Sequence, residues 1–101
     1  MIFYIRFEED LMKYSITIQG RGGHGSRPDR SYNPVDCFAA AFGAMQLIDC
    51  KISQVDGGSA VNVIPDKLTF LAECSAGSQK LLQVLEPIGK LYHCSFEITT
   101  L

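Results

Sequence analysis

The sequence predicts an α+β fold, a ferredoxin-like two-layer sandwich in which two helices cover one face of a four-stranded antiparallel sheet. Alternating apolar segments, typical of half-buried strands, and segments with helical spacing follow one another in the order strand, helix, strand, strand, helix, strand. This order is the split βαβ pattern of such sandwiches. The chain has 101 residues, 47% of them hydrophobic, which supports one modest core and excludes two domains.

The first strand and the first helix flank a loop that is rich in glycine. Residues 14–19 alternate between apolar and polar types, so we expect a strand that ends at Gly20. Residues 20–32 are dense in glycine, proline and polar side chains, which predicts a loop with several left-handed backbone positions. Asn33 and Pro34 then suit the cap and the first position of a helix. We expect its apolar face to consist of Val35, Phe38, Phe42, Met45 and Ile48.

The second half of the chain supplies two more strands, a helix and a last strand. Residues 51–55 alternate weakly and residues 67–74 alternate clearly, which predicts the second and third strands. Leucine and isoleucine recur at helical spacing over residues 78–92, where we expect a helix that Pro87 bends or interrupts. Residues 95–99 are the predicted fourth strand.

The remaining residues at the start of the chain lie outside this unit. We therefore divide the chain into an N-terminal extension, residues 1–13, and one domain, residues 14–101. Within the extension, residues 2–7 could add another strand to the sheet or pair with a neighbouring molecule.

Composition excludes several classes of protein. Nine Lys and Arg against eleven Asp and Glu give a formal charge of −2, which lacks the basic surface of a nucleic-acid-binding protein. The apolar stretches are too short for a membrane-spanning helix, and the first residues have no basic segment of a signal peptide, so we expect a cytoplasmic protein. No C-x-x-C pair is present, and we expect free, mostly buried thiols rather than a zinc site at Cys37, Cys50, Cys74 and Cys94.

Two glycine-rich segments are candidates for a functional site. Residues 20–25 match the G-x-G-x-x-G pattern of dinucleotide-binding proteins, but Pro28 and Pro34 delay the helix that this pattern requires at its third glycine. The segment therefore places one imidazole, His24, in a glycine-rich loop. Taken alone, such a histidine is more often a turn residue than a catalytic group. In the second segment, residues 57–66, Asn62 lies among apolar residues, where asparagine is commonly a turn residue too.

Taken together, these segments resemble one protein family. The motifs Gly-Arg-Gly-Gly-His-Gly-Ser-Arg-Pro (residues 20–28), Asn-Pro (33–34) and Gly-Gly-Ser-Ala-Val-Asn-Val-Ile-Pro-Asp (57–66) resemble the dimerisation, or lid, domain of the zinc-dependent aminoacylase and carboxypeptidase metallopeptidases. The nearest branch is the amidohydrolases that cleave N-acyl amino acids such as hippurate. The resemblance spans residues 14–101 and implies the same fold, inserted in a larger catalytic domain. It also implies a homodimer formed through an edge strand and an adjacent helix of this domain.

The resemblance also implies roles for individual residues. His24 would reach across the dimer into the partner's active site and help to polarise the scissile carbonyl, a task that suits an imidazole. Asn62, with Gly23 and Gly58, would lie near the substrate. The family binds two zinc ions through histidines and carboxylates of its catalytic domain, whereas this chain has only two histidines and no His-x-Asp motif. We therefore expect no metal bound by this chain.

Three features of the sequence differ from the family pattern. Glu8 and Glu9 resemble the family's Glu-Glu pair, but its flanking residues are absent, and a solvated acidic turn is the simpler interpretation. The connection at residues 49–51 is shorter than usual. Glu73 occupies a position where an arginine often ends the third strand.

We therefore expect the lid domain of a zinc-dependent amidohydrolase or peptidase that is not catalytically complete alone. Whether the chain is a fragment of a full hydrolase or a natural remnant stays open, and so does whether it is an enzyme. The alternative is a stand-alone homodimeric module that binds a small ligand or regulates another protein, since this fold serves many such domains. A pocket between two copies that holds a small carboxylate near His24 or Arg27 would favour that alternative.

Overall fold

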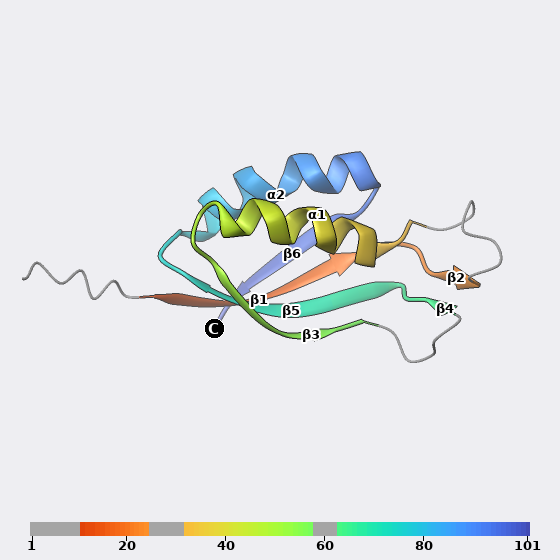
Figure 1. Cartoon of the computed structure of the whole chain (residues 1–101), viewed down its shortest axis with the longest axis horizontal. Helices are drawn as coiled ribbons and strands as arrows, with labels where there is room; N and C mark the ends of the chain where they lie inside the picture. The colour runs from red at the N-terminus through yellow and green to blue at the C-terminus, as the bar shows by residue number, and fades with distance from the viewer. Residues whose placement is uncertain (1–10, 25–31, 58–62) are drawn as a thin grey trace, which may run out of the picture.

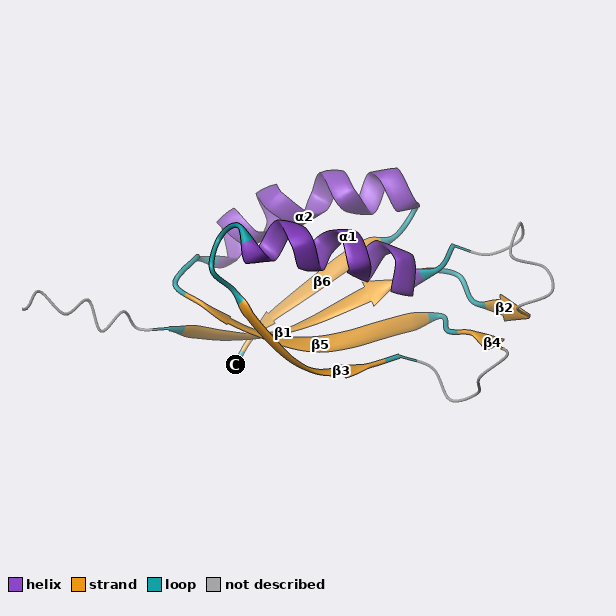
Figure 2. Cartoon of the chain, viewed as in Figure 1, coloured by secondary structure: helices purple, strands orange, loops and turns teal. Residues whose placement is uncertain are grey.

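A four-stranded antiparallel sheet with both helices on one face forms the body of the molecule (Figures 1 and 2). The computed structural model describes residues 11–24, 32–57 and 63–101. The strands of the sheet are β1 (Met12–Gln19), β3 (Lys51–Asp56), β5 (Lys67–Cys74) and β6 (Ser95–Thr100), in the spatial order β3-β5-β1-β6. This arrangement confirms the predicted α+β sandwich. The first strand begins two residues earlier than predicted, because Met12 pairs with Cys74.

The helices are α1 (Pro34–Gln46) and α2 (Ser78–Tyr92). The predicted start of α1 is confirmed: the Asn33 side chain accepts a hydrogen bond of 2.9 Å from the Val35 amide, and Pro34 follows the cap. Helix α2 is not interrupted at Pro87. Pro87 lies on the exposed side of α2, where water can hydrate the carbonyl that the missing proline N–H leaves without a partner.

The core lies between the sheet and the two helices. Alternate residues of β1 and β5 point to this side, among them Ile16 and Phe70, which are fully buried. The predicted apolar face of α1 is wrong at two positions, since Val35 and Phe42 remain 42% and 44% exposed. Helix α1 contacts both the sheet and α2. The fully buried residues of α1 are Pro34, Cys37, Ala41 and Met45.

Among the described residues other than glycine, left-handed backbone conformations occur at Asp49, Gln54 and His93, which lie outside the glycine-rich loop. Asp49, with a φ of 57°, closes the short connection from α1 to β3, and His93 ends α2. In the described part of the glycine-rich loop, Gly20 and Gly22 do not adopt a left-handed φ. That prediction is therefore wrong for these two glycines.

A second, two-stranded sheet was not predicted. It pairs β2 (Gly23–His24) with β4 (Val63–Ile64) and lies at one end of the main sheet (Figure 1). Leu11 and the C-terminal Leu101 lie at the opposite end, where the Leu101 amide donates to the Lys13 carbonyl. The length of β1, eight residues or about 26 Å, separates the two ends.

Several predictions concern residues that the structure does not describe. The possible strand at residues 2–7 and the Glu8-Glu9 pair lie outside the described residues, so the division between extension and domain stays a prediction. The four cysteines are free, and three of them are buried, as predicted. Within residues 11–24, 32–57 and 63–101, no helix has the length and hydropathy needed to cross a membrane.

Candidate functional site

The structure brings together the two glycine-rich motifs that the sequence singled out. Gly23 pairs with Ile64 and His24 with Val63, so that residues 20–24 and 63–66 form one projection, which we call the tongue. The tongue continues β1 on one side and leads into β5 on the other (Figure 2). The backbone of His24 therefore lies beyond the end of the main sheet.

Asp66 ties the two sides of the tongue together at its root. Its backbone carbonyl accepts hydrogen bonds from the Gly20 amide at 2.8 Å and from Gln19 Nε2 at 3.2 Å. Its carboxylate oxygen Oδ1 accepts a third hydrogen bond from the Gly22 amide at 2.9 Å. Asp66 thus binds three residues of the segment that leads to His24, namely Gln19, Gly20 and Gly22.

Two glycines allow the backbones of the tongue to approach closely. A Cβ atom on Gly22 would lie 2.5 Å from the Ile64 carbonyl oxygen and 2.7 Å from Asp66 Oδ1. A Cβ atom on Gly20 would clash with the carbonyl oxygen of Tyr32. These glycines are required for close packing, since neither has the positive φ that usually explains glycine in a loop.

A backbone pair and a ring contact hold the other side of the tongue. Arg21 and Tyr32 exchange two backbone hydrogen bonds of 2.8 Å. The Tyr32 ring packs on the His93 ring, with centroids 4.9 Å apart. Since His93 ends α2, this contact joins the tongue to the helical layer.

The structure describes only some of the predicted site residues. The backbones of Gly23 and His24 lie in β2, whereas Asn62, Gly58 and Arg27 lie outside the described residues. Sequence reasoning missed Asp66 as a contact of the tongue, although it is the last residue of the second motif. Glu73 lies far from the tongue, near the Met12 end of the sheet, between Lys13 and Lys51 in register.

The described residues do not fit a zinc centre. Within this part of the chain, no group of three or more His, Cys, Asp or Glu side chains could hold a metal ion. Burial, together with a neighbouring thiol, raises the pKa of Cys37 and that of Cys50 to about 12; the neighbouring thiol is that of Cys94 for Cys37 and that of Cys74 for Cys50. Because a metal ligand or nucleophile must be a thiolate, neither thiol suits such a role at neutral pH.

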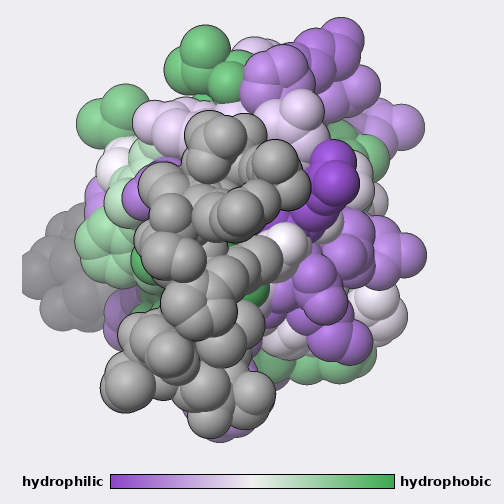
Figure 3. Space-filling model, turned by 90° about the vertical axis from the view of Figure 1, so that its right-hand side faces the viewer, coloured by the Kyte–Doolittle hydropathy of each residue, from purple (hydrophilic) through white to green (hydrophobic). Residues whose placement is uncertain are grey.

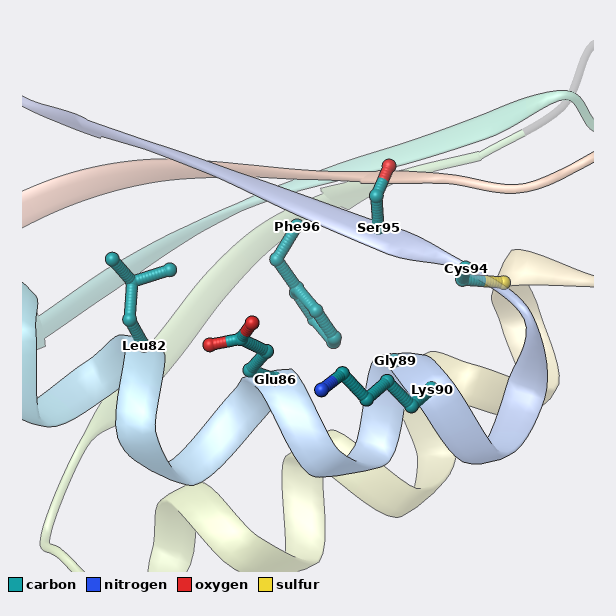
Figure 4. Close-up of a pocket in the computed structure, with 7 residues that line it drawn as sticks. All are labelled: Leu82, Glu86, Gly89, Lys90, Cys94, Ser95 and Phe96. Carbon is teal, nitrogen blue, oxygen red and sulfur yellow. The ribbon is translucent and has the colours of Figure 1, made fainter.

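A pocket of about 420 Å³ opens between α2 and the start of β6 (Figure 4). Glu86 and Lys90 reach along one side of it, and the Phe96 ring projects from β6 toward α2. None of its lining residues belongs to the tongue or to either glycine-rich motif. The pocket therefore lies apart from the segments that carry the predicted site residues.

An apolar flank runs along α1 beside the edge strand β3. Phe38 packs against Phe70 of the core with ring centroids 5.0 Å apart, and Phe42 lies beyond it, 6.0 Å from Phe38. Phe42 and Val35 lie on the same side of α1, since residues seven apart share a helix face, and both are exposed, as is Val55 of β3. Figure 3 shows hydrophobic residues gathered on this flank, at its left, while hydrophilic residues cover most of the opposite flank. We call Val35, Phe42 and Val55 the apolar flank.

Comparison with known proteins gives consistent results. A family model described as "Peptidase dimerisation domain" matches residues 9–91. The hippurate hydrolase of Campylobacter jejuni is 34% identical over 68 residues, which cover 56% of this chain and 18% of that protein. An IAA-amino acid hydrolase ILR1-like 2 of Arabidopsis thaliana is 26% identical over 102 residues, covering 84% of this chain and 23% of the relative.

The solved structures agree with this fold. A tripeptidase from Staphylococcus aureus superposes on 90% of this chain with a TM-score of 0.72 at 22% identity, and the match covers 28% of the tripeptidase. This likeness supports the fold alone. The chain spans about a fifth of the length of the two curated relatives.

Proposed function

The chain belongs to the peptidase dimerisation domain family, and on that premise we propose that it joins two copies of a zinc-dependent hydrolase of N-acyl amino acids or small peptides. The names of the relatives, a hippurate hydrolase and an IAA-amino acid hydrolase, support this substrate class. The alternative of a stand-alone ligand-binding module is not favoured, because the matches lie in hydrolases and the pocket lies apart from the motifs.

The apolar flank is the observation that supports self-association most directly. Phe42 and Val35 leave large apolar side chains in water on a helix beside β3, an edge strand of the sheet that the described residues form. A two-fold axis beside β3 and perpendicular to the sheet would keep the helices of both copies on one face and place their apolar flanks against each other. The homodimer we propose therefore forms through α1 and β3.

The position of the tongue supports a role for His24 in the partner's active site. A catalytic domain joined to this chain at Leu11 or Leu101 would lie at one end of the sheet, about 26 Å from the tongue at the other end. His24 is therefore better placed to serve the catalytic domain of another copy than its own. There, its imidazole would donate a hydrogen bond to the developing oxyanion.

The zinc ions and the general base belong to the catalytic domain in this proposal, because the described part of this chain offers no metal site. Asn62, Gly23 and Gly58 would lie beside the substrate, as the resemblance to the family implies. We place the protein in the cytoplasm, which the four free cysteines support, since thiols persist in reducing compartments.

A mixed-dimer experiment tests this function. The dimerisation domain of the Campylobacter hippurate hydrolase is replaced with this chain, and two differently tagged copies are coexpressed. One copy carries His24→Ala, and the other carries an inactivated catalytic domain. Purified mixed dimers should hydrolyse hippurate although neither parent does, because the intact catalytic domain receives His24 from its partner.

The control is Gln83→Ala, at an exposed position of α2, in place of His24→Ala, which should leave the unmixed chimera active. Mixed dimers without activity would contradict a role in the partner's site. Full activity of the His24→Ala chimera by itself would contradict any catalytic role of His24.

A further inference from the structure

Strand pairing among the described residues gives the tongue little support. Within them the β2–β4 sheet contains two residue pairs, and an isolated two-stranded sheet is marginal even when it is longer. Contacts at the root of the tongue should therefore help to fix the direction in which residues 23 and 24 leave the main sheet. The described contacts at the root of the tongue are the candidates.

Asp66 is the residue that links the tongue to the rigid part of the fold. It follows β4 by two residues and directly precedes Lys67, which pairs with Gln19 as the last pair of the β1–β5 ladder. The Asp66 backbone carbonyl binds Gly20 at this ladder end, while the carboxylate reaches further out to the Gly22 amide. The Asp66 side chain thus fixes the backbone at Gly22, which is two residues closer to His24 than Gly20 is.

The hydrogen bond to Gly22 has the properties of an orienting contact. A carboxylate that accepts from a backbone N–H forms a stronger hydrogen bond than a neutral acceptor does. The 2.9 Å bond crosses between segments that are 44 residues apart in sequence, so it fixes one motif against the other. Gly22 is confined by the same contact, since a Cβ would lie 2.7 Å from Asp66 Oδ1.

From these contacts we infer that Asp66 is a positioning residue for His24: its carboxylate holds the Gly22 amide and thereby sets the direction in which the tongue presents His24 to a partner molecule. The inference rests on the proposed function for the role of His24, whereas the hydrogen bond between Asp66 and Gly22 is independent of that function. The carboxylate itself touches neither substrate nor metal in this account. Its loss should disorder the tongue while the sheet and the helices stay folded.

Amide hydrogen exchange in the 101-residue chain tests the contact directly. In Asp66→Ala, the Gly22 amide should exchange about 10- to 100-fold faster, as expected for the loss of a hydrogen bond to a charged acceptor. The Gly20 amide is an internal control, because it binds the backbone carbonyl of residue 66, which the substitution retains. Asp66→Asn keeps an oxygen acceptor and should restore most of the protection of Gly22.

A matched control substitution removes a carboxylate elsewhere. Asp56→Ala, at an exposed end of β3, should change neither amide. Unchanged exchange at Gly22 in Asp66→Ala would overturn the inference. Equal acceleration at Gly20 and Gly22 would overturn it as well, because it would mean that the whole sheet end opens.

The chimeric hydrolase links this contact to activity. Asp66→Ala should lower kcat about 10- to 100-fold with KM unchanged, because misplacing a group that acts in the transition state affects turnover rather than substrate binding. Asp66→Asn should recover most of kcat. If His24→Ala abolishes turnover and Asp66→Ala does not lower it, the positioning role of Asp66 is wrong. If His24→Ala leaves turnover intact, the proposed function fails, whereas the exchange result for Asp66 still stands.

Discussion

Replacing Phe42 with glutamate should separate the two copies of the dimer and leave each copy folded. Phe42 is 44% exposed, and a phenylalanine has roughly 200 Å² of surface, so about 90 Å² per copy is free to be buried by a partner. At about 25 cal/mol per Å², this burial contributes roughly 2 kcal/mol per copy and roughly 4 kcal/mol per symmetric dimer. The dissociation constant should therefore rise by about a thousandfold. Two glutamates facing each other across the two-fold axis would weaken association further.

Sedimentation velocity over a range of protein concentrations measures this change. The matched control is Leu91→Glu, which makes the same change in charge at a 74% exposed position of α2. Leu91→Glu should leave the dissociation constant unchanged, and both variants should keep the circular dichroism spectrum of the native chain. Dissociation by Leu91→Glu with no effect of Phe42→Glu would refute the apolar flank as the interface.

Three further predictions concern stability, each measured by urea denaturation. Asn33→Ala should lower the free energy of unfolding by about 1 kcal/mol by removing the cap of α1, and Asn33→Ser should lose much less. Gly89→Ala should destabilise the fold by about 1–3 kcal/mol, because the added Cβ would lie 2.6 Å from the Cys94 carbonyl oxygen. Gly43→Ala should stabilise the fold by about 0.5–1 kcal/mol, because Gly43 has open space around it and alanine favours the helix. Equal effects of the two substitutions would contradict the close packing of Gly89. Burial raises the pKa of Cys37 and Cys50 to about 12 from 9.0, so the unfolded chain loses these protons first as pH rises. Stability should therefore be unaffected below about pH 9 and fall by up to about 1.4 kcal/mol per pH unit and thiol toward pH 12, and a flat profile would contradict the raised pKa values.

The elements that depend on local sequence could be predicted closely. Strand β5 and helix α2 have the predicted bounds, because strict alternation and helical spacing each extend over the whole segment. The start of α1 follows from Asn33 and Pro34, whose side chains act on the adjacent backbone. The family resemblance, which rests on motifs at separate places in the chain, agrees with the family-model match.

Features that depend on distant contacts could not be predicted. The choice between Cys37 and Phe42 for the buried side of α1 depends on where α2 and the sheet lie, and spacing alone does not give that. The tongue is a contact between segments about 40 residues apart, and neither segment has the alternation of a strand long enough to detect. The role of Gly22 in close packing follows only from its neighbours Ile64 and Asp66.

Sedimentation equilibrium of the purified 101-residue chain tests the central claim most directly. A domain that associates through the apolar flank should give a mass of about 22 kDa at micromolar to millimolar concentrations, twice the 11.1 kDa of one chain. The Phe42→Glu variant should give 11.1 kDa over the same range. A native chain that stays at 11.1 kDa at the highest concentration would contradict the account of this domain as a dimerisation unit.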